Sequence, residues 1–408
     1  MQALVERSLV YPYATARRLQ AGWWSIYDSI HVPLIVKLAA KNLFFDRLRF
    51  IATIIGIVFS IVLVNVQMGL FVSFGRMVTT MIDHSSADLW IVPQGTRSFE
   101  DPAPLDESER FRALSIKGVA DAVPIVIGFS EWRVPGGKAT PIFIIGSSMK
   151  GQGLQPWNVV EGNLDSLVIP GAVAVDHSYF DRLAVKGMGA IAQIHDTKVQ
   201  VRVISDGIRS FTTTPYIFST LDRARTFIGM PANKDTYVLV HLAPGANLQK
   251  VRSKLQQTLS NVDVLTPGEF GDRSRSFWLF GTGAGAALFA GALLGMIVGT
   301  VIVAQTLYSS TKDHLYEFAT LRAIGSSSLY IYTVIIIQAL VSAVIGFSIA
   351  AAIGVMVVNA TADSALPIAM PLGLTVMLFL LTVAMCVISA VSAILKVMRM
   401  DPAMVFAR

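Results

Sequence analysis

The side chains with the greatest capacity for chemistry are few and scattered along this chain of 408 residues. Its single cysteine, Cys386, excludes an internal disulfide and any zinc site built from several cysteines. No G-x-S-x-G nucleophile elbow is present. The histidines show no metal-ligand spacing such as H-E-x-x-H, and each is interpreted as a surface or hydrogen-bonded residue: His31, His84, His177, His195, His241 and His314. We therefore expect no catalytic residue, no directly bound cofactor and no metal site.

A Gly-Lys pair at Gly137 and Lys138 is the feature that most suggests nucleotide binding. A phosphate-binding loop needs its first glycine five residues before the second, and that position is occupied by Trp132. The segment Pro135-Gly136-Gly137 is instead interpreted as a hairpin turn. The chain therefore has no P-loop with which to bind and hydrolyse ATP itself.

The elements that hold these residues are dominated by long apolar segments. Hydrophobic residues make up 53% of the chain and charged residues only 15%, with a mean hydropathy of +0.58. A soluble domain has about 25% charged residues, so this composition argues against an ordinary cytosolic enzyme. Four windows without Asp, Glu, Lys or Arg each exceed the roughly 20 residues that cross a bilayer: Phe50–Gly75, Ser276–Thr311, Ala323–Ala362 and Ser364–Leu395. They predict membrane-spanning helices over residues 50–75, 276–308, 327–358 and 371–395.

The remaining segments are predicted to be a tail with an interfacial helix (1–49), a large domain (76–275), a short loop (309–326), an outer loop (359–370) and a second tail (396–408). The first tail carries a net charge of +4 and the second +2, whereas the outer loop contains Asp363 and no basic residue. By the positive-inside rule, both termini and the 309–326 loop are expected in the cytoplasm. The large domain and Asp363 are then expected outside, in a multi-pass protein of the inner (plasma) membrane.

The large domain alternates strand and helix patterns. Strands are predicted at Ala87–Val92, Pro124–Val134, Ala139–Gly146, Ile191–Ile194, Lys198–Ile204 and Thr236–Leu242, and helices at Glu107–Ala113, Thr220–Ile228 and Asn247–Leu259. The fold class expected is therefore an α-helical membrane protein with four transmembrane helices and a large extracytoplasmic α+β domain between the first and second. With 21 basic and 20 acidic residues, that domain is nearly neutral, so nucleic-acid binding is not expected.

The second span contains a series of glycines at helical spacing. The stretch Phe277–Leu307 has 31 residues. As one helix it would measure roughly 46 Å, longer than the bilayer core, and it is expected to extend rigidly into the outer domain. Small residues four apart let helices approach closely, either within one subunit or across a dimer, although glycine is also generally enriched in membrane helices. The glycines concerned are Gly281, Gly285, Gly291, Gly295 and Gly299.

The loop between the second and third spans combines apolar and charged residues. Leu315, Phe318 and Leu321 recur every three residues beside Glu317 and Arg322. Gly325 can end a short helix here. This pattern suits docking in the groove of a cytoplasmic partner, and it also suits a solvated turn that lies on the membrane.

This loop resembles the coupling segment of ABC transporter permeases of the MacB/FtsX/LolC type (type VII), whose pattern is approximately E-x-x-x-L-R-A-x-G. The chain has Ala319 where the common form has glycine, and it resembles the DevC branch, the permease of the heterocyst glycolipid exporter, more closely. The matching positions are Glu317, Leu321, Arg322, Ala323 and Gly325, Gln67-Met68-Gly69-Leu70, Ala87-Asp88-Leu89, and the Asp401-Pro402-Ala403 ending, with looser matches at Glu161-Gly162 and Gly171–Asp176.

The resemblance implies a homodimer of permeases embedded in membrane lipids, with a separate cytoplasmic ATPase that holds ATP and Mg. It implies mechanotransmission, in which closure of the ATPases moves the long helices and outer domains, and coupling through Leu315, Glu317, Phe318, Leu321, Arg322 and Gly325. DevC-type systems also pair with a periplasmic adaptor and an outer-membrane channel. The expected function is export of a lipid or another amphipathic substrate. The alternatives are an FtsX-like regulator of a cell-wall hydrolase and a membrane-anchored sensor or enzyme, of which the last lacks an output domain and a catalytic constellation.

Overall fold

The computed structural model describes Ala39, Leu43, Phe45, residues 47–149, 151–313, Tyr316, 327–364 and 366–398. The expected interfacial helix and the two terminal tails lie almost entirely outside the described residues. The described chain forms two compact units. One contains residues 47–65, 293–354 and 372–398, and the other contains residues 66–292 and 355–371.

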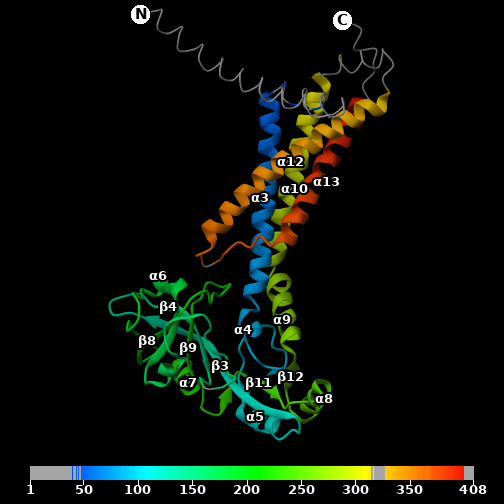
Figure 1. Cartoon of the computed structure of the whole chain (residues 1–408). Coiled ribbons are helices and arrows are strands. Elements are labelled where there is room, and N and C mark those ends of the chain that lie inside the picture. The colour runs from blue at the N-terminus through cyan, green and yellow to red at the C-terminus, as the bar shows by residue number, and fades with distance from the viewer. Residues whose placement is uncertain are drawn as a thin grey trace, which may run out of the picture. The chain divides into compact units, whose positions relative to one another are not determined.

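Four helices are long and apolar enough to cross a membrane, as expected from the charge-free windows. They are α3 (Arg47–Met77), α10 (Ala284–Asp313), α12 (Ser328–Thr361) and α13 (Leu372–Met398). Their candidate spans cover Arg47–Met77, Ala284–Asp313, Tyr332–Thr361 and Leu372–Leu395. The α+β domain lies between the first and second spans, so the expected fold class is confirmed (Figure 1).

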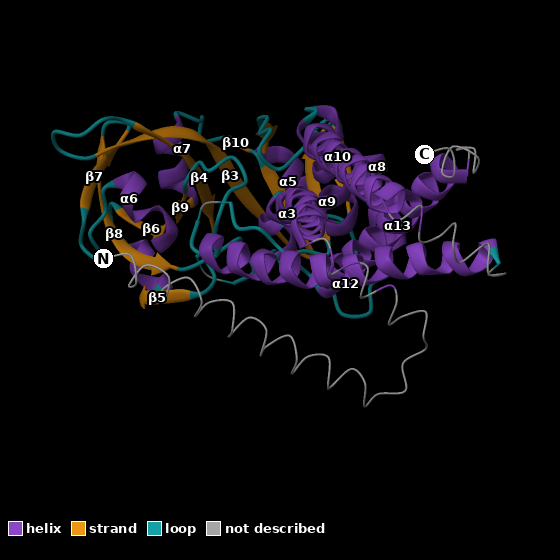
Figure 2. Ribbon diagram, turned by 90° about the horizontal axis from the view of Figure 1, so that it is seen from above, coloured by secondary structure: helices purple, strands orange, loops and turns teal. Residues whose placement is uncertain are grey.

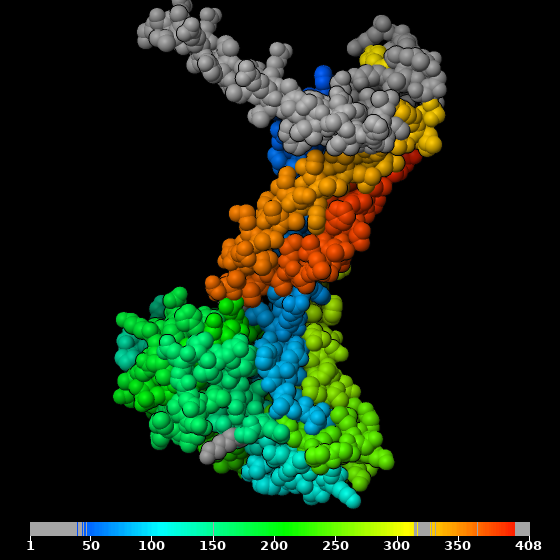
Figure 3. All heavy atoms as spheres, viewed as in Figure 1, coloured from blue at the N-terminus to red at the C-terminus, as the bar shows by residue number. Residues whose placement is uncertain are grey.

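The first unit has a core of apolar residues drawn from all four helices. Ile57 and Ile61 of α3 pack with Val303 of α10, and the same cluster contains Ala343 of α12 and Met385 of α13. Helices α12 and α13 lie side by side (Figure 3), and the ring centroids of Phe347 and Phe379 are 5.2 Å apart. Alanines in the same cluster let the helices approach closely: Ala339, Ala343, Ala350, Ala390 and Ala393.

The second span does not continue into the outer domain as one helix, so the expectation of an unbroken helix over Phe277–Leu307 is wrong. Helix α9 (Pro267–Ser276) is followed by a π-helical turn over Phe277–Gly281, and α10 starts only at Ala284. Gly283 between them adopts a φ of +77°, which ends the helical hydrogen bonding. The apolar composition of this stretch is uniform, but its glycines permit a local change of helical geometry.

The outer domain contains a mixed sheet of ten strands in the order β12-β1-β11-β3-β4-β9-β6-β8-β5, with β7 paired to β3 and β8. The strands are β1 (Leu89–Pro93), β3 (Val119–Arg133), β4 (Thr140–Ser147), β5 (Val159–Gly162), β6 (Ala172–Asp176), β7 (Ile191–Ile194), β8 (Thr197–Ser205), β9 (Tyr216–Thr220), β11 (Tyr237–Leu242) and β12 (Val262–Leu265). A separate two-stranded sheet pairs β2 (Leu105–Asp106) with β10 (Lys234–Asp235). The pairs β4–β9 and β6–β8 are parallel, and the others are antiparallel.

The expected hairpin at Pro135-Gly136-Gly137 is confirmed, and the structure contains a second hairpin between β7 and β8. Strands β3 and β4 pair antiparallel around the predicted turn, where Gly136 adopts a φ of +75°. Strands β7 and β8 pair antiparallel around the turn at His195 and Asp196. Turn residues that tolerate a left-handed backbone therefore marked both reversals of the chain.

The outer-domain helices are short: α4 (Thr80–Asp83), α5 (Glu107–Leu114), α6 (Phe180–Leu183), α7 (Leu221–Ile228), α8 (Leu248–Thr258) and α9. Asn247 caps the start of α8, because its side chain accepts a hydrogen bond from Lys250 N at 3.1 Å. Helix α9 begins with a reciprocal capping box between Thr266 and Glu269. Both devices satisfy amide groups that the first helical turn leaves unpaired.

The long strand β3 joins the two halves of the sheet. Its first part pairs with β11 and its second part with β4. Strands β3 and β4 are labelled as neighbours in Figure 2. Ile125 and Ile127 point into one apolar core, whereas Val126 points into another. Burial on both faces explains why this strand reads as a continuous hydrophobic run instead of a clean alternation.

Candidate functional site

The expected coupling segment lies outside the described residues. Its candidate residues Leu315, Glu317, Phe318, Leu321, Arg322 and Gly325 all fall within 314–315 and 317–326. Helix α10 runs to Asp313, Tyr316 is helical and 56% exposed, and α12 begins at Ser328.

An ion pair joins the first two spans next to this segment. Arg49 Nη2 of α3 lies 2.6 Å from Asp313 Oδ2 at the end of α10. The Asp313 side chain is 57% exposed, so the pair contributes little to stability by itself. The ion pair holds the start of α3 next to the end of α10, which immediately precedes the coupling segment in the chain.

Three of the five candidate glycines face the first span. A Cβ added at Gly291 would lie 2.6 Å from Gln67 Nε2 of α3. One at Gly295 would lie 3.1 Å from Leu63 Cδ2, and one at Gly299 would lie 2.6 Å from Ser60 Cβ. Residue numbers rise along α10 as they fall along α3, so the two helices are antiparallel neighbours. Only glycine fits at these approaches without displacing the facing side chain.

The other two candidate glycines meet their own segment. The atoms nearest to a Cβ at Gly281 belong to Phe277, and those nearest at Gly285 are backbone atoms of Leu279. Gly281 closes the π-helical turn and Gly285 lies in the first turn of α10. These positions accommodate the change of helical geometry between α9 and α10.

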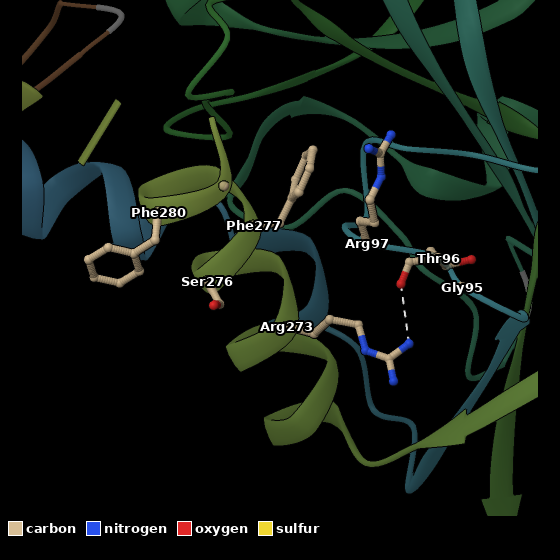
Figure 4. A pocket seen from close by; sticks show the side chains of 8 residues that line it. Gly95, Thr96, Arg97, Arg273, Ser276, Phe277 and Phe280 are labelled. Carbon is tan, nitrogen blue, oxygen red and sulfur yellow. Dashed lines mark hydrogen bonds between the residues drawn. The ribbon is translucent and has the colours of Figure 1, made fainter. Parts of the chain in front are cut away.

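A cavity of about 530 Å³ lies along α9 and the π-helical turn (Figure 4). The guanidinium of Arg97 lies 4.6 Å from the ring centroid of Phe277 and donates to Asp101 through Nε at 2.9 Å. Arg273 donates to Thr96 O at 3.2 Å, and Phe280 points away from both arginines. The remaining lining residues are Gly95, Ser276 and Gly281.

The charges at this cavity are compensated. Arg273 Nη1 lies 2.6 Å from Asp263 Oδ2, and Arg97 is paired with Asp101. The cavity therefore presents aromatic surface beside neutralised charge, and neither arginine offers an uncompensated cation to an anionic ligand.

A buried carboxyl group, Glu100, lies in the segment that follows β1. It accepts a hydrogen bond from the Tyr216 hydroxyl at 3.1 Å. Burial raises the pKa of Glu100 to about 8, although the hydrogen bond from Tyr216 acts in the opposite direction. Sequence reasoning missed this residue, because nothing in its local pattern distinguishes it from a surface carboxylate.

Among the described residues, no group of three or more His, Cys, Asp or Glu side chains lies close enough to hold a metal ion. Sequence reasoning singled out Gln67 and Gly69 only as part of a motif. In the structure Gln67 faces Gly291, and a Cβ at Gly69 would lie 2.6 Å from Ile368 Cγ2.

Four apolar helices of spanning length, with an α+β domain inserted between the first and second, give the chain the architecture of a polytopic membrane protein. The family model of the MacB-like periplasmic core domain matches residues 50–258, and that of the FtsX-like permease C-terminal region matches residues 289–402. The first match alone spans more than half of the chain. The chain therefore belongs to the MacB/FtsX family of ABC-type permeases, multi-pass proteins of the inner membrane that work with a cytoplasmic ABC ATPase.

Three solved structures are similar to part of this chain. The periplasmic region of MacB from Actinobacillus actinomycetemcomitans is 12% identical, with 45% of this chain and 90% of that chain covered and a TM-score of 0.36. The extracellular domain of the noncanonic ABC-type transporter YknZ from Gram-positive bacteria is 15% identical (44% and 99% covered, TM-score 0.33). A domain of a putative permease from Porphyromonas gingivalis is 14% identical (44% and 90% covered, TM-score 0.30). No curated protein matches the chain.

Proposed function

We propose that this permease is the membrane subunit of an ATP-driven exporter that works by mechanotransmission and moves a lipid or another amphipathic substrate. ATP and Mg bind to the partner ATPase, and the permease transmits the ATPase's closure to the outer domain. The permease acts as a homodimer with both termini in the cytoplasm, and its outer domain engages a periplasmic adaptor linked to an outer-membrane channel.

The observation that carries this proposal is the path from α10 into the outer-domain core. Helix α10 leads back through the π-helical turn to α9, and Phe270 of α9 is fully buried among the outer-domain aromatics. Its ring centroid lies 5.7 Å from that of Tyr237 of β11. Phe270 therefore ties α9, which precedes the second span in the chain, to the sheet of the outer domain.

The assignment to the DevC branch is part of the same proposal. It rests on the Glu317–Gly325 segment and on the motif Gln67-Met68-Gly69-Leu70. Two residues of that motif have close contacts in the structure. Gln67 faces Gly291, and Gly69 has no side chain to collide with Ile368. Glycolipid is the substrate of that branch, and a lipid or similar amphipathic molecule is the class proposed here.

The coupling role is tested by reversing the charge at Glu317. We expect Glu317→Lys to lower the ATP turnover that the permease stimulates in its partner ATPase by at least tenfold, while the membrane fold stays intact. The matched control is Asp196→Lys, which makes the same charge change at a hairpin tip with a side chain 93% exposed. If Glu317→Lys stimulates ATP turnover as well as the control does, Glu317 takes no part in coupling.

The exporter and regulator alternatives differ in the outer partner. The full permease in lipid nanodiscs is expected to capture a periplasmic adaptor encoded beside it. Capture of a cell-wall hydrolase and no adaptor would instead support the FtsX-like role.

A further inference from the structure

The loop that joins α12 to α13 belongs to the same compact unit as the outer domain. Residues 355–371 cluster with residues 66–292, whereas most of α12 and α13 belong to the other unit. The outer loop, expected from the sequence over residues 359–370, corresponds in the structure to residues 362–371 between α12 and α13, of which all but residue 365 are described. It is seen in Figure 1 as the connection between α12 and α13.

A second loop, residues 206–215 between β8 and β9, is held rigidly on the outer domain. The buried carboxylate of Asp176 accepts hydrogen bonds from Ile208 N at 2.8 Å, from Gly207 N at 3.3 Å and from Ser205 Oγ at 2.9 Å. Ser210 N donates to the Tyr179 hydroxyl at 2.7 Å. These bonds fix the backbone on both sides of residue 209, so the direction of that side chain is set by the outer domain.

The same loop packs on the outer end of the first span. Phe211 is 5% exposed, and its ring centroid lies 5.0 Å from that of Phe74 of α3 and 4.7 Å from that of Trp278 in the π-helical turn. Both pairs have edge-to-face geometry, which is favourable for aromatic rings. The 206–215 loop is thus seated between α3 and the π-helical turn.

Arg209 connects this loop to the outer loop. Its Nε donates to Ser178 Oγ at 3.0 Å, and its Nη1 donates to the carbonyl oxygen of Ala362. The side chain is only 14% exposed, whereas Asp363, whose Oδ1 lies 3.9 Å from Nη2, is fully exposed. The planar guanidinium therefore spans two anchors at once, and the backbone carbonyl is the stronger of its two contacts on the outer loop.

The outer loop also packs on α3, at Gly69. Ala369 N donates to Gly69 O at 3.4 Å, and a Cβ at position 69 would collide with Ile368. Ile368 N in turn donates to Thr361 Oγ1 at 3.2 Å, which folds the loop back on the end of α12. The outer loop thus contacts the first span at Gly69 and the outer domain at Arg209.

We propose that Arg209 is a positioning residue that locks the outer loop to the outer domain, so that the two move as one body when the spans move. This inference rests on the proposed mechanotransmission function. It identifies the Arg209 contact, called here the Arg209 joint, as one connection through which motion reaches the outer domain. Transmission then reaches the outer domain through two connections, the α9 path from the second span and the Arg209 joint from the hairpin of α12 and α13.

The test is a distance distribution between spin labels at Asp196→Cys and Leu366→Cys, in a Cys386→Ser background. Asp196 is 93% exposed and Leu366 is 38% exposed. The full permease is reconstituted in nanodiscs with its partner ATPase and diluted with unlabelled copies. With Arg209 present, we expect one narrow distribution that is the same without nucleotide and in the vanadate-trapped state.

Arg209→Ala is expected to broaden this distribution at least twofold, and Arg209→Lys should give an intermediate width, because an ammonium cannot hold Ser178 and Ala362 together. Asp363→Asn should leave the width unchanged. The matched control is Arg133→Ala, since Arg133 on β3 pairs with the neighbouring Glu131. An unchanged width in Arg209→Ala, or a broad distribution with Arg209 present, would overturn the proposal.

Amide hydrogen exchange distinguishes loss of the Arg209 contact from unfolding of the 206–215 loop. In Arg209→Ala the amides of Gly207 and Ile208 should stay protected by Asp176, and their loss of protection in a variant with an unchanged label distance would also contradict the joint. If the joint behaves as expected but ATP changes no distance elsewhere in the outer domain, the joint stands and the mechanotransmission function fails.

Discussion

Phe270 of α9 and Trp90 of β1 lie with their ring centroids 5.3 Å apart, and both side chains are completely buried. Phe270 is the residue through which the helix preceding the second span enters the outer-domain core. The same aromatic group contains Phe99, Phe143, Tyr216 and Tyr237. A large apolar contact of this kind resists sliding, so α9 and the sheet move together.

Truncation of this contact should detach α9 from the sheet. Phe270→Ala is expected to lower the free energy of unfolding of the outer domain by about 3–5 kcal/mol, because it removes a buried ring and leaves a cavity. Denaturant unfolding of the full permease in detergent, followed by tryptophan fluorescence, measures the change. Phe111→Ala on α5, where the side chain is 52% exposed, is the control and should cost under about 1 kcal/mol. Equal losses in the two variants would refute the anchoring role.

The contact between α10 and α3 at Gly299 should not tolerate a side chain. Gly299→Val is expected to lower stability by about 1–3 kcal/mol, since its Cβ would lie 2.6 Å from Ser60 Cβ and 2.9 Å from Met385 Sδ. A thermal melt of the purified permease measures this. Gly373→Val, at a position with open space around it, serves as the matched control and should melt like the unmodified protein. A Gly299→Val protein that also melts normally would show that the helices separate at no cost.

Much of this architecture is predictable from the sequence, because its signals are local. Absence of charge over more than 20 residues identifies a span, and a turn such as Pro135-Gly136-Gly137 identifies a hairpin. The break in the second span is different, because glycine is common in unbroken membrane helices too. The structure reveals the interruption through the π-helical turn and the φ of +77° at Gly283.

Long-range partners are the part that local patterns miss. Arg209 and Ala362 are 153 residues apart in the chain, and Glu100 and Tyr216 are 116 apart. Neither Arg209 nor Glu100 has a neighbouring pattern that marks it as buried, since each lies in an irregular segment. The coupling residues show the opposite case: their motif is local and readable, and their geometry lies outside the described residues.

Glu100 predicts how the stability of the outer domain depends on pH. The folded protein holds this proton up to about pH 8, whereas the unfolded chain releases it near the ordinary value of 4.5. Between these values the folded state binds more protons, so stability falls as the pH rises and is constant above about pH 8. The full shift corresponds to about 5 kcal/mol.

The Glu100 contribution is isolated by comparison with Glu100→Gln, which keeps the shape and cannot ionise. Denaturant unfolding at pH 5 and pH 8 should show a loss of stability in the unmodified protein that is smaller by several kcal/mol in Glu100→Gln. Glu131→Gln, with a side chain 55% exposed, is the control and should follow the unmodified protein. The same pH dependence in Glu100→Gln would mean that Glu100 is ionised in the folded protein.

The central claim is that ATP hydrolysis by the partner moves the outer domains, and the distance between two copies of one residue tests it most directly. A single spin label at Asp196→Cys in a Cys386→Ser background gives one label per permease in the complex with its ATPase. We expect a defined distance between the two copies that shifts on vanadate trapping, and that does not shift in Glu317→Lys. An identical distance distribution with and without vanadate, or no distance between copies at all, would contradict it.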